Sequence, residues 1–384
     1  MKILHVITSC HPRVGGPIEG IRQLSKYYKK YNIFAHILCS DKPGEKHTKD
    51  KTLPKIYAVG PGKFAFAYNP RLFNWLQKNI DNYDLIIVNG IWQYHNFAVW
   101  KNAKKKNIPY YVIAHGMLDP WFNHNYPLKF IKKIFYWWII QYWVLKNAKK
   151  ILFTTKEEGK LAKKSFVPFP KNCVTMGYGI SGYKKNRGKN LFNMKYPNLN
   201  KKKILLYLSR IAEKKGLDLL IHAFNEIKEN KIHLVIAGNN QNIYAQKIKD
   251  LIKKKKLENF ITWVGPLHGK IKWDALRSAS LFCLPSHQEN FGIVITESLS
   301  CGTPVLITNK VNIYKNIAKY KAGLVSSNNI SSFSKKLLKF QELNLIEQNK
   351  MSKNALKCFK DNFDISSHTN SLANLLKKEF AKKN

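Results

Sequence analysis

The sequence predicts an α/β protein built from two successive doubly wound domains, and three observations lead to this fold class. The length of 384 residues exceeds one ordinary core and suits two domains of about 150–200 residues each. Short apolar runs typical of buried strands alternate with helix-like runs in two separate series. A polar segment rich in Lys and Asn, residues 181–202, lies between the two series and has no apolar period.

The first series begins at the apolar run 2–7 and defines a domain over residues 1–180. Its expected strands are 2–7, 33–39, 84–88, 110–114 and 151–154. Its expected helices are 17–30, 70–80, 96–106 and 128–147. Because strands that alternate with helices are joined by crossovers, we expect a parallel sheet covered on both faces.

The second series follows the predicted linker 181–202 and defines a domain over residues 203–364. Its expected strands are 203–208, 232–237, 260–264, 281–285 and 304–307. Its expected helices are 216–229, 242–255, 270–279 and 293–300. From about residue 330 the chain is expected to be helical. For the C-terminal helix over 365–384, both packing on the second domain and crossing back to the first domain stay open.

The net charge of +43 limits the classes of partner. Such a charge fits nucleic acid or an anionic membrane surface. However, only six of the 66 basic residues are Arg, and the lysines are spread along the whole chain. This pattern favours a general compositional bias over nucleic-acid binding, and no nucleic-acid recognition motif is present. We therefore expect no specific nucleic-acid partner, but an attraction to acidic lipids.

The six cysteines are scattered and form neither a Cys-x-x-Cys pair nor a Cys/His cluster at zinc spacing. This indicates reduced thiols in the cytoplasm and argues against a structural metal. The N-terminal run 1–8 lacks the longer apolar stretch and cleavage site of a signal peptide. We expect a cytoplasmic protein with no metal and no cofactor.

The most informative stretch is 286–304, which predicts a strand end, a loop, a helix and a second strand. Glu289 falls in the loop at the carboxyl end of a strand, where open α/β sheets bind ligands. Gly292 opens the helix, so backbone N–H groups can face an anion there. Glu297 lies about one turn further, and a carboxylate can accept two hydrogen bonds from a vicinal diol.

This Glu-x7-Glu pattern with Phe291-Gly292 inside it resembles the nucleotide-sugar glycosyltransferases of family 4, also called group 1. The resemblance implies the GT-B fold, with two Rossmann-like doubly wound domains facing a cleft. It also implies that Glu289 meets the donor sugar and that Glu297 holds the ribose. Further donor-binding residues that it implies are Phe291, Gly292 and Ile293.

The loop after strand 203–208 contains Arg210 and Lys215. A nucleotide diphosphate gains negative charge as it leaves the sugar, and a fixed Arg/Lys pair can stabilise that charge. Arg210 and Lys215 match the Arg-x4-Lys of the resembling family. The adjacent Lys214 makes a register one residue earlier the alternative.

Three further loops carry residues that the resemblance assigns to the site. Gly15 and Gly16 lie between the first strand and helix, where the family faces the donor phosphates and the acceptor; an ordinary tight turn is the alternative. Gly238 and Gly265 end two strands of the second domain and are expected to approach base and ribose through their backbones.

His115 follows strand 110–114, and in many family members a histidine here meets the donor sugar. The longer pattern His-Gly-Met-Leu-x-Pro-Trp over 115–121 resembles a subgroup that builds bacterial surface polysaccharide. Asp119 fits a turn cap. The segment 89–92, from Asn89 to Trp92, fits an acceptor pocket, and a Trp92 simply packed in its loop is the alternative. The turn 176–180 lacks the Asn and the acidic residue that the family usually has there, so its usual contacts are in doubt.

The aromatic and basic segment 127–150 has two interpretations. Its longest unbroken apolar run is far too short to span a bilayer, which takes roughly 20 residues. A core helix packed on the first sheet is the favoured interpretation. A helix on an anionic membrane surface is the other, because Trp, Tyr and Lys suit that interface.

These observations together predict a retaining glycosyltransferase. We expect it to move a sugar from a nucleotide diphosphate to a hydroxyl of a glycan or lipid-linked acceptor. The partners are then the nucleotide-sugar donor, that acceptor and an anionic membrane touched peripherally on its cytoplasmic face. Two other classes stay open: another GT-B enzyme, such as a phosphorylase or epimerase, and a non-enzymatic basic binder of nucleic acid or membrane.

Overall fold

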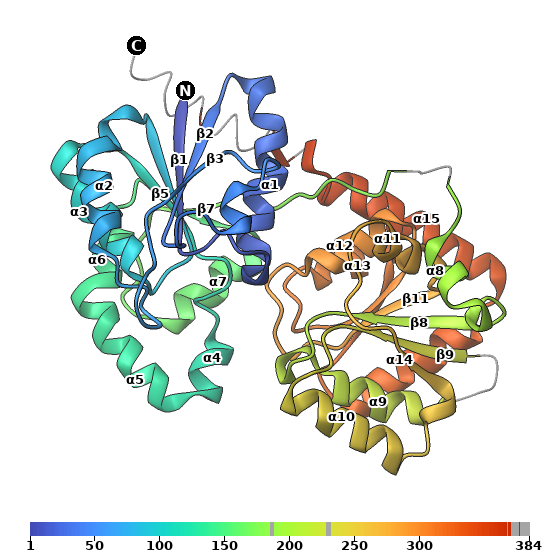
Figure 1. Cartoon of the computed structure of the whole chain (residues 1–384). Coiled ribbons are helices and arrows are strands. Elements are labelled where there is room, and N and C mark those ends of the chain that lie inside the picture. Colours follow the sequence, from blue (N-terminus) through green and yellow to red (C-terminus); the bar gives the residue numbers. More distant parts are fainter. Residues whose placement is uncertain (185–187, 228–231, 367, 370–375, 377–384) are drawn as a thin grey trace. The chain divides into compact units, whose positions relative to one another are not determined.

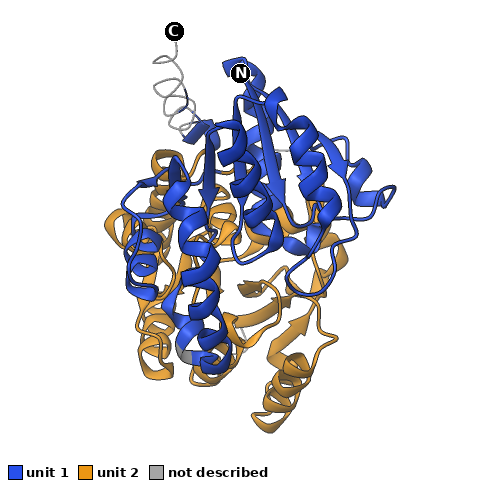
Figure 2. Cartoon of the chain, turned by 90° about the vertical axis from the view of Figure 1, so that its left-hand side faces the viewer, with its two compact units in different colours: residues 1–179, 365–384 blue, residues 180–364 orange. Residues whose placement is uncertain are grey.

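The computed structural model divides the chain into two compact units. Unit 1 comprises residues 1–179 and 365–384, and unit 2 comprises residues 180–364 (Figure 2). The structure describes residues 1–384 except 185–187, 228–231, 367, 370–375 and 377–384. The chain therefore leaves unit 1 once, builds unit 2, and contributes again to unit 1 near its end.

Unit 1 is a parallel sheet of seven strands in the order β3-β2-β1-β4-β5-β6-β7. Its strands are β1 (Lys2–Ile7), β2 (Phe34–Cys39), β3 (Lys55–Ala58), β4 (Leu85–Asn89), β5 (Tyr110–Ile113), β6 (Lys150–Phe153) and β7 (Cys173–Thr175). Its main helices are α1 (Gly16–Tyr28), α2 (Pro70–Asn79), α3 (Tyr94–Lys106), α4 (Pro120–Asn125), α5 (Pro127–Tyr136), α6 (Tyr142–Asn147) and α7 (Lys156–Ser165). All pairings in this sheet are parallel, as the crossovers require.

The alternation of side chains along β1 explains why helices cover both faces of the sheet. Leu4 and Val6 pack into a cluster with residues of α2, α3 and α6. Ile3 and Ile7 point to the other face, where α1 supplies the apolar partners. Figure 1 shows α2, α3 and α6 on one side of this sheet and α1 on the other. β1 is thus buried on both faces from Ile3 to Ile7.

Unit 2 repeats the same design with six parallel strands in the order β10-β9-β8-β11-β12-β13. They are β8 (Lys203–Leu208), β9 (Ile232–Ala237), β10 (Ile261–Trp263), β11 (Leu281–Leu284), β12 (Val305–Thr308) and β13 (Gly323–Ser326). Its helices are α8 (Leu191–Lys195), α9 (Leu217–Asn225), α10 (Ile243–Lys254), α11 (Gly269–Ser278), α12 (Ile293–Ser300), α13 (Tyr314–Tyr320), α14 (Ile330–Glu342) and α15 (Leu345–Asn362). The predicted fold class, two doubly wound α/β domains, is confirmed.

Two segments differ from the elements expected for them. Part of the expected linker carries α8, whose first residue Leu191 donates its N–H to Asp274 of α11 at 2.9 Å, so these residues belong to unit 2. The single helix expected over 128–147 is interrupted by a π-helical segment, Trp137–Gln141. Within the described residues, no helix combines the length and hydropathy that crossing a membrane requires.

Candidate functional site

The loops after β8 and β11 meet at the point where the strand order of unit 2 reverses. β8 and β11 are neighbours in the sheet, whereas β9 and β12 continue the sheet in opposite directions. In open α/β sheets, ligands bind beside the carboxyl ends of the strands at this switch point. The loop after β8 carries Arg210 and Lys215, and the loop after β11 carries Glu289. Three residues that the sequence predicts for the site therefore converge.

Lys215 and Glu289 form an ion pair between these two loops. The ammonium of Lys215 donates to Oε2 of Glu289, and both side chains are largely buried. Lys214 instead lies near Gln288, with 3.4 Å between Nζ and Oε1. Arg210 is exposed. The structure thus distinguishes the two adjacent lysines, because Lys215 is the one that contacts the predicted carboxylate.

The surroundings of Glu289 keep its carboxylate ionised. Burial alone would raise the pKa of Glu289, but Lys215, then Lys214 and Arg210, favour the charged form and lower the pKa below its ordinary value of 4.5. The backbone is fixed as well: the N–H of Glu289 donates to Lys310 O, and its carbonyl accepts from Asn312 N. A rigid anion with three cations around it suits a polar ligand with both phosphate and hydroxyl groups.

Glu297 lies on α12 and pairs with a residue that the sequence did not suggest. Nζ of Lys272, on α11, is 2.6 Å from Oε1 of Glu297. Gly292 is the N-cap of α12, so the helix begins with the unpaired N–H groups that favour an anion. Ile293 is the first residue of that helix, whereas the Phe291 ring is buried and packs edge-to-face on Phe363.

Gly238 and Gly265 follow the neighbouring strands β9 and β10. The N–H of Gly238 donates to Gly265 O at 3.0 Å, which ties the two strand ends together. Both residues lie at the same carboxyl edge of the sheet as Arg210 and Glu289, because all the strands are parallel. The predicted donor residues of unit 2 therefore share one edge of one sheet.

In unit 1, Gly15 and Gly16 lie at the start of α1. Gly15 is the N-cap of that helix and Gly16 its first residue, next to the strand-order reversal between β1 and β4. The carbonyl of Gly16 accepts a hydrogen bond from the Tyr178 hydroxyl at 3.0 Å. Tyr178, from the atypical turn 176–180, also stacks on His368. This turn thus anchors the glycine loop through a tyrosine, in place of the missing Asn.

His115, after β5, belongs to a buried chain of hydrogen bonds. Its Nε2 lies 3.3 Å from Oδ1 of Asn89, at the end of β4. Nδ2 of the same amide is 3.1 Å from Ile87 O and 3.4 Å from Nδ1 of His5. Nε2 of His5 is 2.9 Å from the hydroxyl of Tyr28. Four polar side chains, from two strands, one helix and the loop after β5, are thereby linked in one line.

This chain fixes the tautomer of His115. An amide oxygen only accepts, so Nε2 of His115 carries the hydrogen and Nδ1 presents a lone pair. Burial lowers the pKa of His115 to about 4. Burial, and then the nearby charge of His115, lower the pKa of His5 to about 3. Both rings are therefore neutral near pH 7, and His115 is a hydrogen-bond acceptor and not a cation there.

The turn that holds His115 is fixed by a carboxylate that sequence reasoning missed. Oε1 of Glu158, on α7, accepts the N–H of Gly116 at 2.6 Å, and its Oε2 accepts from Thr154. Glu158 is buried, and nothing in its local sequence indicates a partner 42 residues away. His115 itself has a left-handed φ of 50°, an uncommon conformation that such contacts maintain.

Two neighbouring residues have structural roles. Asp119 is the N-cap of α4 and accepts the N–H of Trp121 at 2.9 Å, as a capping residue does. Nε1 of Trp92 donates to Met117 O, and its ring packs against Phe166. The packing interpretation of Trp92 therefore agrees with the structure.

Two family models match the chain. Residues 190–357 match "Glycosyl transferases group 1", and residues 14–175 match "Glycosyltransferase Family 4". The two matches together extend over most of both units. The first contains Arg210, Lys215, Glu289 and Glu297, and the second contains His115.

Comparison with known proteins gives both partial relatives and full-length structural neighbours. Mannosylfructose-phosphate synthase of Agrobacterium fabrum is 31% identical over 124 residues, 30% of this chain and 27% of the relative. The O-antigen biosynthesis glycosyltransferase WclY of Escherichia coli is 30% identical over 101 residues, 26% of this chain and 27% of the relative. The chain thus spans little more than a quarter of the length of these curated relatives.

Among solved structures, Anabaena HepE, crystallised with UDP and glucose, has a TM-score of 0.78 at 16% identity, covering 98% of this chain and 100% of that one. At this identity the likeness concerns the fold. Because the match covers 98% of this chain, the fold similarity includes both domains of the GT-B architecture.

Proposed function

We propose that this chain, which belongs to the family 4 (group 1) glycosyltransferases, transfers a sugar from a nucleotide diphosphate to a hydroxyl of a glycan or lipid-linked acceptor. The observation that carries this proposal is the ion pair of Lys215 and Glu289 at the switch point of unit 2, with Arg210 beside it. Two cations and a carboxylate lie on adjacent loops there, and this supports roles for them at the diphosphate and the sugar of a donor. We further propose that the anomeric configuration is retained.

Lys215 can serve both halves of the donor at once. An ammonium group has three donor hydrogens, so a hydrogen bond to Glu289 leaves donors for a phosphate oxygen. Arg210 is exposed at the same loop and offers a planar guanidinium to the second oxygen pair. As the sugar–oxygen bond breaks, charge grows on the diphosphate, and both cations stabilise it more in the transition state than in the ground state.

The two glutamates recognise different parts of the donor. Glu289 is anionic and immobile, so it accepts hydrogen bonds from hydroxyls of the transferred sugar. Glu297 accepts from the ribose hydroxyls, and the ion pair with Lys272 holds its carboxylate in place. A carboxylate has about four lone-pair sites, so one ion pair does not exhaust it.

For unit 1 we propose that His115 presents its neutral Nδ1 to a hydroxyl of the reacting sugar. The hydrogen bond from Nε2 to Asn89 supports this orientation. We assign no side chain as a nucleophile. The retaining step is then a same-face displacement, in which the leaving phosphate oxygen takes the proton of the acceptor hydroxyl as the new bond forms.

We also propose that unit 1 touches an anionic membrane through one face of α5 and the residues after it. No residue of α5 is buried. Leu128, Phe135 and Trp138 are 78%, 66% and 53% exposed, and their spacing places them on one side of a helix. Lys129 and Lys132 are exposed on the same helix. Exposed apolar groups flanked by lysines suit the boundary between headgroups and acyl chains.

A panel of nucleotides and nucleotide-sugars tests the proposed activity. We expect one nucleoside diphosphate to raise the unfolding temperature of the chain, and its sugar conjugate to be hydrolysed slowly without an acceptor. UDP, which HepE binds, comes first in the panel. Glu297→Ala should weaken binding of the free nucleotide by about 1–3 kcal/mol.

Glu289→Gln is the matched variant, and it should keep nucleotide affinity while lowering turnover. No binding of any nucleotide, or equal nucleotide affinity in wild type and Glu297→Ala, would contradict the donor assignment. Phosphorolysis or epimerisation of the panel compounds would place the chain in another class of GT-B enzyme.

A further inference from the structure

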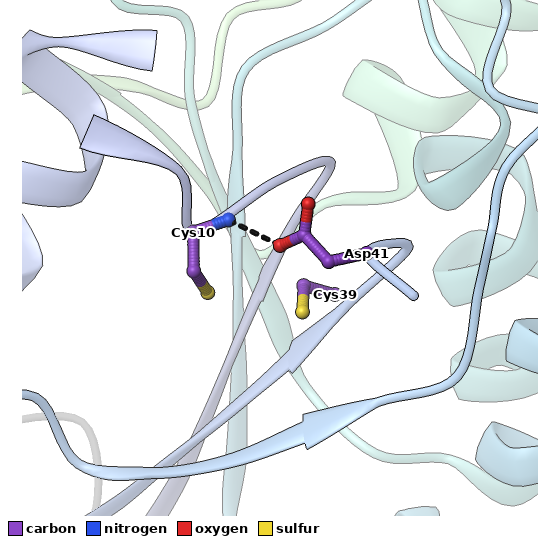
Figure 3. Close-up of side chains that lie close together, drawn as sticks. All are labelled: Cys10, Cys39 and Asp41. Carbon is purple, nitrogen blue, oxygen red and sulfur yellow. Dashed lines mark hydrogen bonds between the residues drawn. The ribbon is translucent and has the colours of Figure 1, made fainter. Parts of the chain in front are cut away.

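We propose that unit 1 contains a binding site for a thiophilic divalent cation, of the Zn²⁺ class, made by Cys10, Cys39 and Asp41. One ligand atom from each of these residues, two sulfurs and a carboxylate oxygen, lies within 4.8 Å of the others. Figure 3 shows the three side chains close together, with Cys39 at the end of β2 and the other two in the loops after β1 and β2. This site lies outside the donor chemistry proposed above and does not depend on it.

The ligand atoms come from rigid elements. Cys39 is the last residue of β2, and Cys10 follows β1 by three residues. These two strands are adjacent and hydrogen-bonded in parallel, with Ile7 opposite Cys39. Both cysteines are buried. The sequence hides the site, because one ligand lies in the loop after β1 and the other two lie at and after the end of β2, so they form no compact spacing pattern.

The separations suit a tetrahedral ion after a small contraction. Zn²⁺ binds sulfur at about 2.3 Å and carboxylate oxygen at about 2.1 Å, so ligand atoms around it stand about 3.4–3.8 Å apart. The present spread, within 4.8 Å, needs side-chain rotations but no rearrangement of the strands. Two thiolates select soft ions such as Zn²⁺ over Mg²⁺ or Ca²⁺.

The carboxylate of Asp41 is already oriented by neighbours. Ser9 Oγ donates to Oδ1 at 2.5 Å, and Cys10 N donates to Oδ2 at 2.6 Å. Such hydrogen bonds to a ligating carboxylate are the usual support around a metal. Each oxygen keeps a second lone pair that a cation can use.

A second observation comes from His47, on the other side of Asp41. Its Nε2 lies 3.3 Å from Oδ1 of Asp41 and 3.3 Å from Oε2 of Glu45. This nitrogen is buried and has no hydrogen-bond partner within the described part of the chain. Although it forms no hydrogen bond, this nitrogen lies at ion-pair distance from both carboxylates and so orients the Asp41 side chain. In our assignment His47 supports Asp41 and does not bind the ion itself.

Loading the ion is balanced by the release of protons. The two thiols lose one proton each to the solvent as two metal–sulfur bonds form, and Asp41 supplies the third ligand atom. Cys10 opens the loop that leads to Gly15 and Gly16. A bound ion would therefore fix the ends of β1 and β2 directly before that loop.

Cobalt titration of the full, reduced chain after treatment with a chelator tests the site. We expect wild type to bind one Co²⁺ with the intense near-ultraviolet absorption of cobalt–thiolate bonds, and Zn²⁺ to abolish this absorption by displacement. Cys10→Ser and Cys39→Ser should each lose or strongly reduce it. Cys283→Ser, which removes a buried thiol of β11 in unit 2, should retain it. His47→Gln should weaken Co²⁺ binding by about 10–100-fold.

Thermal unfolding gives a second measurement if a cysteine variant does not fold. Zn²⁺ should raise the unfolding temperature of wild type and raise it less in Asp41→Asn. Absence of the thiolate absorption in wild type, or its persistence in the folded Cys10→Ser and Cys39→Ser chains, would overturn the proposal. Recovery of Cys10 and Cys39 as a disulfide that Co²⁺ does not prevent would do the same and identify a redox pair.

Discussion

At the residue scale, the most important contact is the ion pair with Glu289, which Lys215 forms and Lys214 does not. We expect Lys215→Ala to lower turnover by about 10²–10³-fold, because it removes a fixed donor to the departing diphosphate and leaves Glu289 buried without its partner. Lys214→Ala should change turnover only slightly, since Lys214 lies toward Gln288. Steady-state kinetics of the two variants decides between them, and an essential Lys214 with a dispensable Lys215 would refute the assignment.

The amide of Asn89 controls the protonation of His115. Asn89→Asp would place a carboxylate against Nε2 of His115, favouring the imidazolium and raising a pKa that burial holds at about 4. NMR titration of the His115 ring measures this shift, and we expect the acid limb of the activity profile to move upward with it. Asn102→Asp is the control, since the Asn102 amide donates to backbone carbonyls of α2 and α3. An unchanged His115 titration would contradict the hydrogen-bond assignment.

The same shift has a consequence for stability. The folded pKa of His115 lies below its ordinary value of 6.5, so the unfolded chain takes up the proton first as the pH falls. Its neutral form therefore contributes fully above pH 6.5, and the contribution is lost as the pH drops from 6.5 toward 4. Asn89→Asp should reduce this loss over that interval.

The residues that sequence reasoning missed share one physical property. Glu158 and Lys272 act through partners that are distant in the chain, and so does Asn89, which the sequence marks only as part of a candidate acceptor pocket. Such contacts depend on the order of strands in a sheet, which a local pattern of residues does not contain. Lys215 and Glu289 could be proposed from the sequence because each follows an apolar strand and matches a motif of the resembling family, but the ion pair between them is visible only in the structure.

At the scale of elements, the strands that the sequence does not reveal are at the edges of the sheets. β3, β7 and β13 each end a sheet, and most of their residues are only half-buried. The central strands β4 and β11 are buried at every position. An edge strand packs against one neighbour and keeps polar residues, so it lacks the continuous apolar run that identifies a strand in a parallel sheet.

The turn between β8 and α9 supports a prediction about backbone geometry. Gly216 has a φ of +66°, and a Cβ there would collide with the carbonyl oxygen of Pro285. Gly265 has a similar φ of +72°, but no atom lies within 4 Å of its Cβ position. Gly265→Ala should therefore cost only the left-handed strain of about 1–2 kcal/mol. Gly216→Ala should cost more, and denaturant unfolding that gives equal losses would contradict this account.

The exposed face of α5 gives a second prediction at this scale. We expect the chain to bind vesicles that contain acidic lipid, to be released by salt, and to ignore neutral vesicles. Phe135→Ser combined with Ile139→Ser should weaken the binding about tenfold or more, because both side chains are exposed and would enter the interface. Phe34→Ser, at an equally exposed phenylalanine of β2, is the control. Cosedimentation that does not respond to lipid charge would contradict the electrostatic part.

The emission of Trp138, compared with that of the buried Trp137, distinguishes insertion of the α5 face into the membrane from contact with the membrane surface. Trp138 is exposed, whereas Trp137 is buried in the core of unit 1. A blue shift in tryptophan emission on vesicle binding should therefore disappear in Trp138→Ser when it is measured in a Trp143→Phe background, because Trp143 is also 43% exposed. A shift that survives this change would show that the face of α5 does not insert.

At the scale of the whole molecule, the chain is not two domains in simple succession, because unit 1 is completed by residues from beyond unit 2. Ile365 and Leu376 are buried in a cluster with Ile3, Leu24 and Tyr28 of β1 and α1. The apolar residues of this last segment were insufficient to predict which sheet they cover. That choice depends on the path of the chain after α15, which ends at Asn362, just before the end of unit 2 at Asp364.

This arrangement predicts which unit loses stability when buried side chains near the C-terminal end are truncated. Ile365→Ala and Leu376→Ala each remove a buried side chain and should destabilise the chain by about 2–5 kcal/mol. Because the cluster belongs to unit 1, amide exchange should accelerate in β1 and α1, while β8 and β11 of unit 2 keep their protection. Leu356→Ala, at a half-exposed position of α15, should leave β1 and α1 unchanged. Faster exchange confined to unit 2 would show that the terminal segment stabilises the other unit.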